Sequence, residues 1–314
     1  MKKIIVAMFD REGYTKRLAE YLIHHCHAML DVRLFTNIEN MRQFLRRERV
    51  EMLLVGEKDW DSAWETEANV HRLIFLSDGD MVCEGTSRQI IFKYQSAESI
   101  VKELLSVIAE DDTIQTGNVK VGIRNAEFIG VYSPFGGAGA STFAYRMAKE
   151  YGVQYLTLYL NMELFDGMSI YQDRQHRDIT GAGRGGMSEL IFYLQQNKDK
   201  LAVKIQALAQ RQDGIDCIAA VEDYRDLYSM KVVDLRHLLQ VLAEETEYQK
   251  ILFDIGYLGE SSLELMRHCD ILYLPKAGSD IQQNKQSSFE QLLIREGDQD
   301  MLERIQFVTM KEAG

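Results

Sequence analysis

The sequence predicts an α/β protein built from two doubly wound domains that are joined by a short polar linker. Three observations favour this architecture. The chain has 314 residues, which exceeds the size at which one hydrophobic core usually keeps growing. Short apolar runs, typical of buried parallel strands, alternate with helical stretches. A polar stretch at Glu110–Asn118 separates two such series, so we place the domains at residues 1–112 and 127–314 and the linker at 113–126.

The first domain is predicted to alternate strands with helices. The strands are expected at Lys3–Phe9, Val32–Phe35, Glu51–Val55, Arg72–Leu76 and Gln89–Phe92. The helices are expected around Leu18–Cys26, at Ile38–Arg47 and at Ala97–Ile108. Five strands in about a hundred residues, each separated by a crossover segment, favour a doubly wound parallel sheet.

This order of elements resembles that of response-regulator receiver domains. Receivers hold magnesium with acidic residues after the first strand, where this chain has Asp10 and Glu12. They also carry a Ser or Thr after the fourth strand and a Lys after the fifth, which Ser77 and Lys93 match. The resemblance therefore extends from the order of elements to part of the receiver site.

The phospho-acceptor of a receiver is an aspartate at the end of the third strand, and this chain departs from that pattern. Val55 and Gly56 stand there, and the nearest carboxylate, Glu57, lies one or two positions later. Without a carboxylate nucleophile no aspartyl phosphate can form. We expect a pseudo-receiver used for docking or dimerisation, with an unrelated flavodoxin-like domain as the alternative.

The second domain opens with a feature that predicts phosphate binding. The apolar strand Glu127–Tyr132 runs into a glycine-rich loop, Ser133–Thr142, and then into a helix. Glycines let backbone N–H groups converge on phosphate oxygens, and the start of the helix adds the positive end of its dipole. Ser141 stands where a hydroxyl would bind magnesium. The residues expected to hold the phosphates are Phe135, Gly136, Gly137, Ala138, Gly139, Ala140, Ser141 and Thr142.

The loop resembles that of the MinD/ParA family of deviant Walker ATPases, whose pattern reads G-K-G-G-x-G-K-[ST]-[ST]. The matching positions are Gly136, Gly137, Gly139, Ser141 and Thr142. The resemblance implies ATP (or ADP) with Mg²⁺ as cofactors, and it implies a homodimer.

Both lysines of that pattern are missing from this chain. Ala140 replaces the lysine that contacts the β- and γ-phosphates, and Phe135 replaces the one that in this family reaches into the partner's site. A positioned cation stabilises the charge that develops during phosphoryl transfer, so we expect little or no hydrolysis. Binding is expected to persist, although a charge-assisted contact is lost.

Two later strands complete the resemblance. Tyr155–Glu163 stands where the family carries a D-x-D pair, which is Asn161 and Glu163 here. Lys250–Gly256 resembles a Walker B strand whose aspartate, Asp254, supports magnesium through water. The metal ligands implied are Ser141 and Asp254, and the candidates for a catalytic role are Glu163 and Asp254.

The remaining predictions concern segments outside the phosphate loop. The glycine-rich stretch Asp178–Leu190 is expected to be a switch or partner-contact segment, and its Arg184 is a candidate substitute cation. A helix is expected around Leu263–Met266, and a strand at Asp270–Leu274. Glu303–Met310 alternates like a strand, so the sequence does not support a membrane-binding C-terminal helix.

A pseudo-receiver ahead of a lysine-poor phosphate loop is similar to the TadZ/CpaE group of the MinD/ParA family. That resemblance implies a bacterial cytoplasmic localisation protein in Tad or type IV-like pilus assembly, recruited to the inner membrane or a cell pole by pilus or secretion machinery. Three functions remain open: a nucleotide-binding scaffold with weak or no ATP hydrolysis, an active MinD/ParA-like ATPase for spatial positioning, and a purely structural interaction protein.

Overall fold

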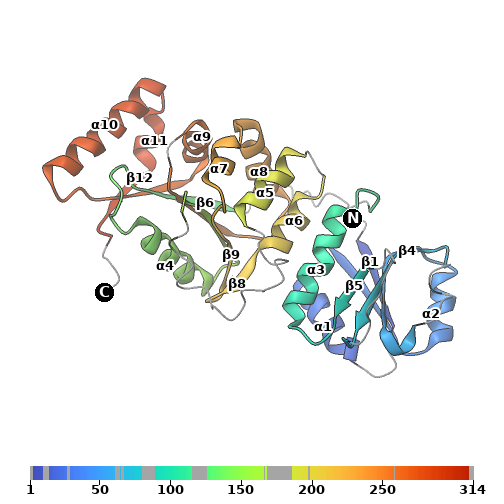
Figure 1. Cartoon of the computed structure of the whole chain (residues 1–314). Coiled ribbons are helices and arrows are strands. Elements are labelled where there is room, and N and C mark those ends of the chain that lie inside the picture. Colours follow the sequence, from blue (N-terminus) through green and yellow to red (C-terminus); the bar gives the residue numbers. More distant parts are fainter. Residues whose placement is uncertain are drawn as a thin grey trace. The chain divides into compact units, whose positions relative to one another are not determined.

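The computed structural model describes residues 3–9, 14–26, 29–60, 64, 67–79, 89–114, 126–165, 167, 186–196, 199–257 and 259–310. The chain divides into two compact units, Met1–Asn118 and Val119–Gly314 (Figure 1). This division falls inside the segment 113–126. None of the helices in the described ranges is long and apolar enough to cross a membrane.

Unit 1 is built on a parallel sheet with the strand order β2-β1-β3-β4-β5. This order is that of flavodoxin-like doubly wound sheets. The strands are β1 (Ile4–Phe9), β2 (Leu30–Phe35), β3 (Val50–Gly56), β4 (Val70–Ser77) and β5 (Gln89–Phe92). The five strands expected from the apolar runs are thus all present, with ends that differ by at most two residues.

The helices of unit 1 are α1 (Tyr14–Cys26), α2 (Ile38–Leu45) and α3 (Ala97–Glu110), with a short 3₁₀ helix, η1 (Glu57–Asp59). Figure 1 shows α2 on one face of the sheet and α1 and α3 on the other. Asn37 begins α2 by accepting hydrogen bonds from the N–H groups of Glu39 and Asn40. Met41 and Leu45 of α2 pack against the strands, next to the fully buried Trp64.

Three of the receiver-like positions lie together at the carboxyl edge of this sheet. Glu57 Oε2 accepts hydrogen bonds from Ser77 Oγ at 3.2 Å and from the N–H of Asp78 at 2.8 Å. Lys93 Nζ forms an ion pair with Asp78. Glu57 is therefore the carboxylate that contacts Ser77, although it follows the third strand rather than ending it. Asp10 and Glu12 lie outside the described residues.

Unit 2 contains a seven-stranded sheet with the order β12-β11-β6-β10-β7-β9-β8. All neighbouring strands are parallel except the hairpin β8–β9. The strands are β6 (Glu127–Tyr132), β7 (Thr157–Met162), β8 (Gln210–Gln212), β9 (Ile215–Ile218), β10 (Lys250–Ile255), β11 (Ile271–Pro275) and β12 (Ile305–Val308). The strand expected within Glu303–Met310 is therefore present, directly after a short helix.

Helices cover both faces of this sheet. They are α4 (Ala140–Gly152), α5 (Met187–Gln195), α6 (Leu201–Leu208), α7 (Tyr224–Ser229), α8 (Val232–Glu244), α9 (Glu260–His268), α10 (Asp280–Glu296) and α11 (Gln299–Arg304). Figure 1 shows α4 on one face and α5, α8 and α9 on the other. The apolar side of α4, with Phe143, Ala144 and Ala148, packs on Ile129 and Val131 of β6. This packing holds the start of α4 at the carboxyl edge of the sheet.

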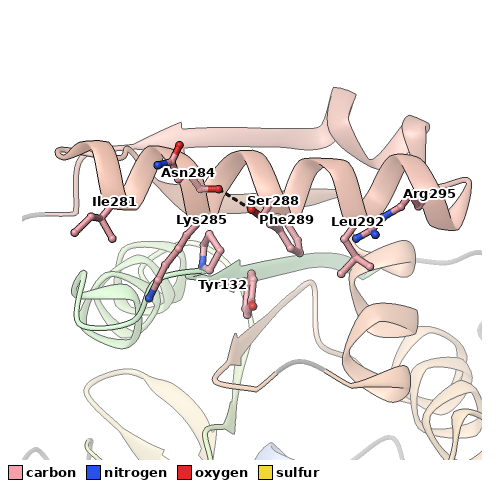
Figure 2. Close-up of a pocket in the computed structure, with 9 residues that line it drawn as sticks. Tyr132, Ile281, Asn284, Lys285, Ser288, Phe289, Leu292 and Arg295 are labelled. Carbon is pink, nitrogen blue, oxygen red and sulfur yellow. Dashed lines mark hydrogen bonds between the residues drawn. The ribbon is translucent and has the colours of Figure 1, made fainter.

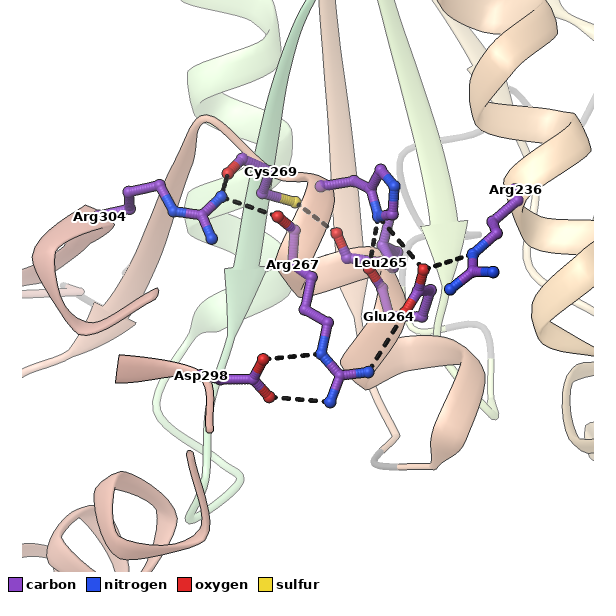
Figure 3. Close-up of polar contacts among 8 residues, drawn as sticks. Arg236, Glu264, Leu265, Arg267, Cys269, Asp298 and Arg304 are labelled. Carbon is purple, nitrogen blue, oxygen red and sulfur yellow. Dashed lines mark hydrogen bonds and ion pairs between the residues drawn. The ribbon is translucent and has the colours of Figure 1, made fainter. Parts of the chain in front are cut away.

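An ionic network ties α9 to neighbouring helices (Figure 3). Arg267 makes a two-pronged contact with Asp298, at 2.8 and 2.9 Å, and donates to Glu264 Oε2 at 3.2 Å. Arg236 of α8 donates to Glu264 Oε1 at 2.7 Å. These contacts, led by the one from Arg236, lower the pKa of Glu264. Such shared pairing is what a nearly buried carboxylate requires.

Candidate phosphate-binding site

The glycine-rich loop leaves β6 after Tyr132 and enters α4 through three glycines in the left-handed region. Gly136 has φ 59°, Gly137 has φ 60°, and Gly139, the N-cap of α4, has φ 78°. A Cβ at Gly136 or Gly137 would meet nothing within 4 Å, so the backbone angle rather than space requires glycine there. The loop thereby presents the unpaired N–H groups of the first turn of α4, where the helix dipole is positive.

The loop carries no positive charge of its own. Residues 133–142 include no Lys or Arg. Phe135 and Ala140, at the two lysine positions, are half-buried, and Ala140 packs against the apolar cluster under α4. Ser133 Oγ is buried and has no hydrogen-bond partner among the described residues. Charge neutralisation must therefore come from backbone dipoles, a metal ion or another element.

The sheet brings Glu163 and Asp254 to the start of α4. β10 lies between β6 and β7, and Asp254 stands in register with Val131 on one side and Asn161 on the other. Glu163 follows β7 directly, and its Oε1 accepts a hydrogen bond from Ser141 Oγ at 2.8 Å. The residues expected to serve the metal, Ser141 and Asp254, thus lie beside Glu163.

The carboxylate of Asp254 is fully buried, and only one of its two oxygens accepts a hydrogen bond from the described residues. Tyr159 donates its hydroxyl proton to Oδ2 of Asp254 at 2.7 Å, whereas Oδ1 accepts no hydrogen bond among the described residues. Burial first, and then the charge of Glu163, raises the pKa of Asp254 to about 7, although the nearby hydroxyls of Tyr159 and Ser141 oppose this shift. Burial also raises the pKa of Glu163, against the hydrogen bond from Ser141.

Tyr159 and Gly256 belong to the site but were not anticipated. Tyr159 lies in the middle of β7, a strand buried on both faces, where a tyrosine hydroxyl needs a polar partner. A tyrosine within an otherwise apolar, buried strand is therefore the sequence feature that indicates a polar partner nearby. Gly256 follows β10, and a Cβ there would stand 1.9 Å from Glu163 Oε2 and 2.7 Å from Glu163 Cα. Glycine at position 256 therefore lets Glu163 occupy its place.

The donor set fits Mg²⁺ that is shared with a phosphate. Mg²⁺ takes oxygen ligands and is usually bound by one or two carboxylates together with phosphate and water. Ser141 Oγ and the carboxylates of Glu163 and Asp254 supply such oxygens, and Oδ1 of Asp254 accepts no hydrogen bond from the described residues. A cation would relieve the repulsion that raises the pKa of Asp254. No group of three or more His, Cys, Asp or Glu able to hold a metal alone occurs in the described ranges.

The candidate substitute cation of the glycine-rich stretch Asp178–Leu190 is Arg184. Residues 178–185, including Arg184, lie outside the described residues. The end of that segment is described, because Gly186 is the N-cap of α5. Glu189, in the first turn of α5, forms an ion pair with Lys204 of α6.

No protein-family model and no curated protein sequence matches this chain. Solved structures similar to it include a ParA-family ATPase from Chlorobium tepidum, with 16% identity, a TM-score of 0.47, and coverage of 59% of this chain and 73% of that one. A plasmid partition protein from Borrelia burgdorferi has 17% identity and a TM-score of 0.45, covering 58% and 76%. The cell division ATPase MinD of Pyrococcus furiosus has 13% identity and a TM-score of 0.40, covering 55% and 68%.

Proposed function

We propose that this chain binds ATP or ADP with Mg²⁺ at the loop Ser133–Thr142 and works as a nucleotide-dependent scaffold with little or no turnover. The observation that carries the proposal is the convergence of Ser141, Glu163 and Asp254 beside a loop whose three glycines are left-handed. Loop N–H groups would hold the phosphates, and Ser141 and Asp254 would hold the metal.

The charges around the loop support binding without efficient hydrolysis. Bound Mg²⁺ would supply the positive charge next to the phosphates, but no Lys or Arg of the loop adds to it. Asn161 accepts a hydrogen bond from the N–H of Glu163, at 3.1 Å, and therefore acts on Glu163 as a structural partner. Glu163 and Asp254 are the candidates to approach an attacking water, yet the loop itself carries no cation to stabilise the transition state.

The direct test is binding of MgATP to the full chain, measured as a Kd by calorimetry and as a change in Tm by thermal unfolding. We expect a saturable Kd and a rise in Tm with MgATP, both lost in Ser141→Ala. Phosphate release should stay close to the uncatalysed rate. A chain whose Tm does not respond to ATP or ADP with Mg²⁺ would refute the proposal.

A wider role follows from the same resemblance and is equally a proposal. We infer a MinD/ParA-like fold for unit 2 and a pseudo-receiver for unit 1, in a TadZ/CpaE-like localisation protein of pilus assembly. The strand order of unit 1 and the absence of an aspartate at Val55 or Gly56 support this. A homodimer is expected, with pilus or secretion proteins as partners. A fluorescent focus of the tagged chain at a cell pole that disappears when the secretion ATPase of the pilus machinery is deleted would support the role. A diffuse signal with and without that ATPase would contradict it.

The pairing of Tyr159 with Asp254 favours a second candidate, a structural interaction protein that binds no nucleotide. A buried carboxylate that is hydrogen-bonded to a tyrosine and has a raised pKa can exist as a neutral core group. The binding experiment separates the two candidates, because a protein of this second kind would show neither a Kd for MgATP nor any effect of Ser141→Ala.

A further inference from the structure

A groove beside the glycine-rich loop contains a lysine that the loop itself lacks. The groove runs between α10 and the end of β6 and has a volume of about 530 Å³. Figure 2 shows Ile281, Lys285, Phe289 and Leu292 extending from one face of α10 on the side of Tyr132. These positions follow the helical i, i+4, i+8, i+11 spacing, so they form one stripe.

The groove adjoins the phosphate loop directly. Pro134, the residue before Phe135, lines the same groove as Lys285. The ring of Tyr132, at the end of β6, packs on Phe289 with centroids 5.2 Å apart, and this contact holds α10 against the strand that leads into the loop. A ligand bound at the loop would therefore lie next to the face of α10 that carries Lys285.

Lys285 is exposed and makes no hydrogen bond or ion pair with any residue in the described part of the chain. Its helical neighbours at i±3 and i±4 are Gln282, Ile281, Ser288 and Phe289, none of which is acidic. The cations on α4, the helix that follows the loop, are instead paired with carboxylates.

Two cations of α4 already have carboxylate partners. Lys149 pairs with Asp213 at 2.9 Å, and Arg146 approaches Glu150 at 3.8 Å. Lys285, by contrast, keeps its charge available for an anionic ligand.

We propose that Lys285 supplies, from α10, the positive charge that a polyphosphate bound at the loop needs in place of the lysines replaced by Phe135 and Ala140. This inference rests on the proposed nucleotide binding. The ammonium group would act as a point charge on the phosphates, as a loop lysine does. Its flexible four-carbon stem lets the ammonium group adjust to the position of a bound phosphate.

The test is the Kd for MgATP of the full chain, measured by calorimetry for the parent and for Lys285→Ala, Lys285→Arg, Arg295→Ala and Ser141→Ala. Lys285→Ala should bind about ten- to a hundredfold more weakly, the loss expected for one charge-assisted contact. Lys285→Arg should retain binding within about threefold, because it keeps the charge. The dependence of Kd on salt should be shallower in Lys285→Ala than in the parent.

Arg295 is the matched control, since it is the other cation that lines the groove. It lies ten residues further along α10, roughly 15 Å away along the helix axis, so Arg295→Ala should leave the Kd unchanged. Equal losses in Arg295→Ala and Lys285→Ala would overturn the assignment, because they would indicate only a general effect of groove charge.

The outcomes separate this inference from the proposed function. If the parent chain binds no nucleotide, both fail. If the parent binds, Ser141→Ala loses binding and Lys285→Ala equals the parent, the loop site stands and the role of Lys285 is wrong. An unchanged Tm without ligand shows that Lys285→Ala is folded, as expected for an exposed side chain.

Discussion

The hydroxyl group of Tyr159 donates a 2.7 Å hydrogen bond to Oδ2 of Asp254, in the interior of unit 2. The two residues lie on adjacent parallel strands, β7 and β10, and both are buried. The carboxylate proposed to support the metal is therefore already held by a neighbouring side chain. Occupation of the site by Mg²⁺ would have to use Oδ1, which has no partner among the described residues, or weaken the bond to Tyr159.

Removing the tyrosine hydroxyl should destabilise the chain at alkaline pH. Tyr159→Phe leaves the carboxylate of Asp254 buried with one donor fewer, which costs about 1–3 kcal/mol. The loss should be smaller at pH 5, where Asp254 is protonated and neutral. Urea unfolding of the parent and of Tyr159→Phe, at pH 5 and at alkaline pH, measures the loss of unfolding free energy under each condition. Equal losses at both would contradict a hydrogen bond to an ionised carboxylate.

Asp254 should make stability fall as pH rises from about 4 to about 7. Its folded pKa is raised from 3.8 to about 7, so the folded state binds more protons than the unfolded state in that window. Asp254→Asn removes the ionisation, and the variant should gain about 4 kcal/mol over the parent between pH 4 and pH 8, the free-energy equivalent of that shift. Parallel stability curves for the parent and the variant would show that Asp254 titrates normally.

Metal binding should follow the opposite trend with pH. The ligand form of Asp254 is the carboxylate, so protons compete with Mg²⁺ below the pKa of about 7. The Kd for MgATP should rise by about tenfold per pH unit once the pH is below that value, if one proton is displaced. Asp254→Asn should bind weakly and without this pH dependence. A Kd that is constant from pH 8 to pH 6, together with unchanged binding in Asp254→Asn, would exclude Asp254 from the metal site.

Substituting Gly256 should disrupt the site through Glu163. The Cβ of Gly256→Ala would stand 1.9 Å from Glu163 Oε2, so Glu163 must move away from Ser141. We expect a loss of about 1–3 kcal/mol in unfolding free energy and at least tenfold weaker MgATP binding. Gly214→Ala is the matched control: its φ is 87° and a Cβ there meets nothing within 4 Å, so it should reduce stability but not binding.

The network around Arg267 should contribute to stability only while its carboxylates are charged. Arg267→Ala removes the two-pronged contact with Asp298 and one contact with the nearly buried Glu264. We expect a loss of about 1–3 kcal/mol at pH 7. The pKa of Glu264 is lowered, so this contribution is fully present at neutral pH and is lost as pH falls through the folded pKa, where the variant should approach the parent. A pH-independent difference would indicate lost packing instead.

Local sequence was sufficient for the strands of unit 1 and for the glycine-rich loop. Apolar runs such as Lys3–Phe9 indicate strands that are buried on both faces. The glycines at 136, 137 and 139 stand where the backbone needs a positive φ, which glycine adopts without strain. The residues Leu190, Ile191 and Leu194 are spaced for one face of a helix and likewise indicate α5. Nothing was predicted between Leu194 and Lys250, although the Asp213–Gly214 pair, with φ 50° and 87°, is a recognised hairpin signal and turns β8 into β9.

The partners within the site depend on long-range packing that no local pattern contains. Strand order inserts β10 between β6 and β7, and this brings Asp254 to Tyr159, 95 residues away along the chain. The same packing holds Lys285 of α10 on a groove that begins at Pro134. The left-handed backbone angles of glycines and the spacing of apolar residues are local properties of the chain, so the sequence alone predicts them. Which side chains meet is set by the order of strands and the faces that helices cover, and that order emerges only when the whole core is buried.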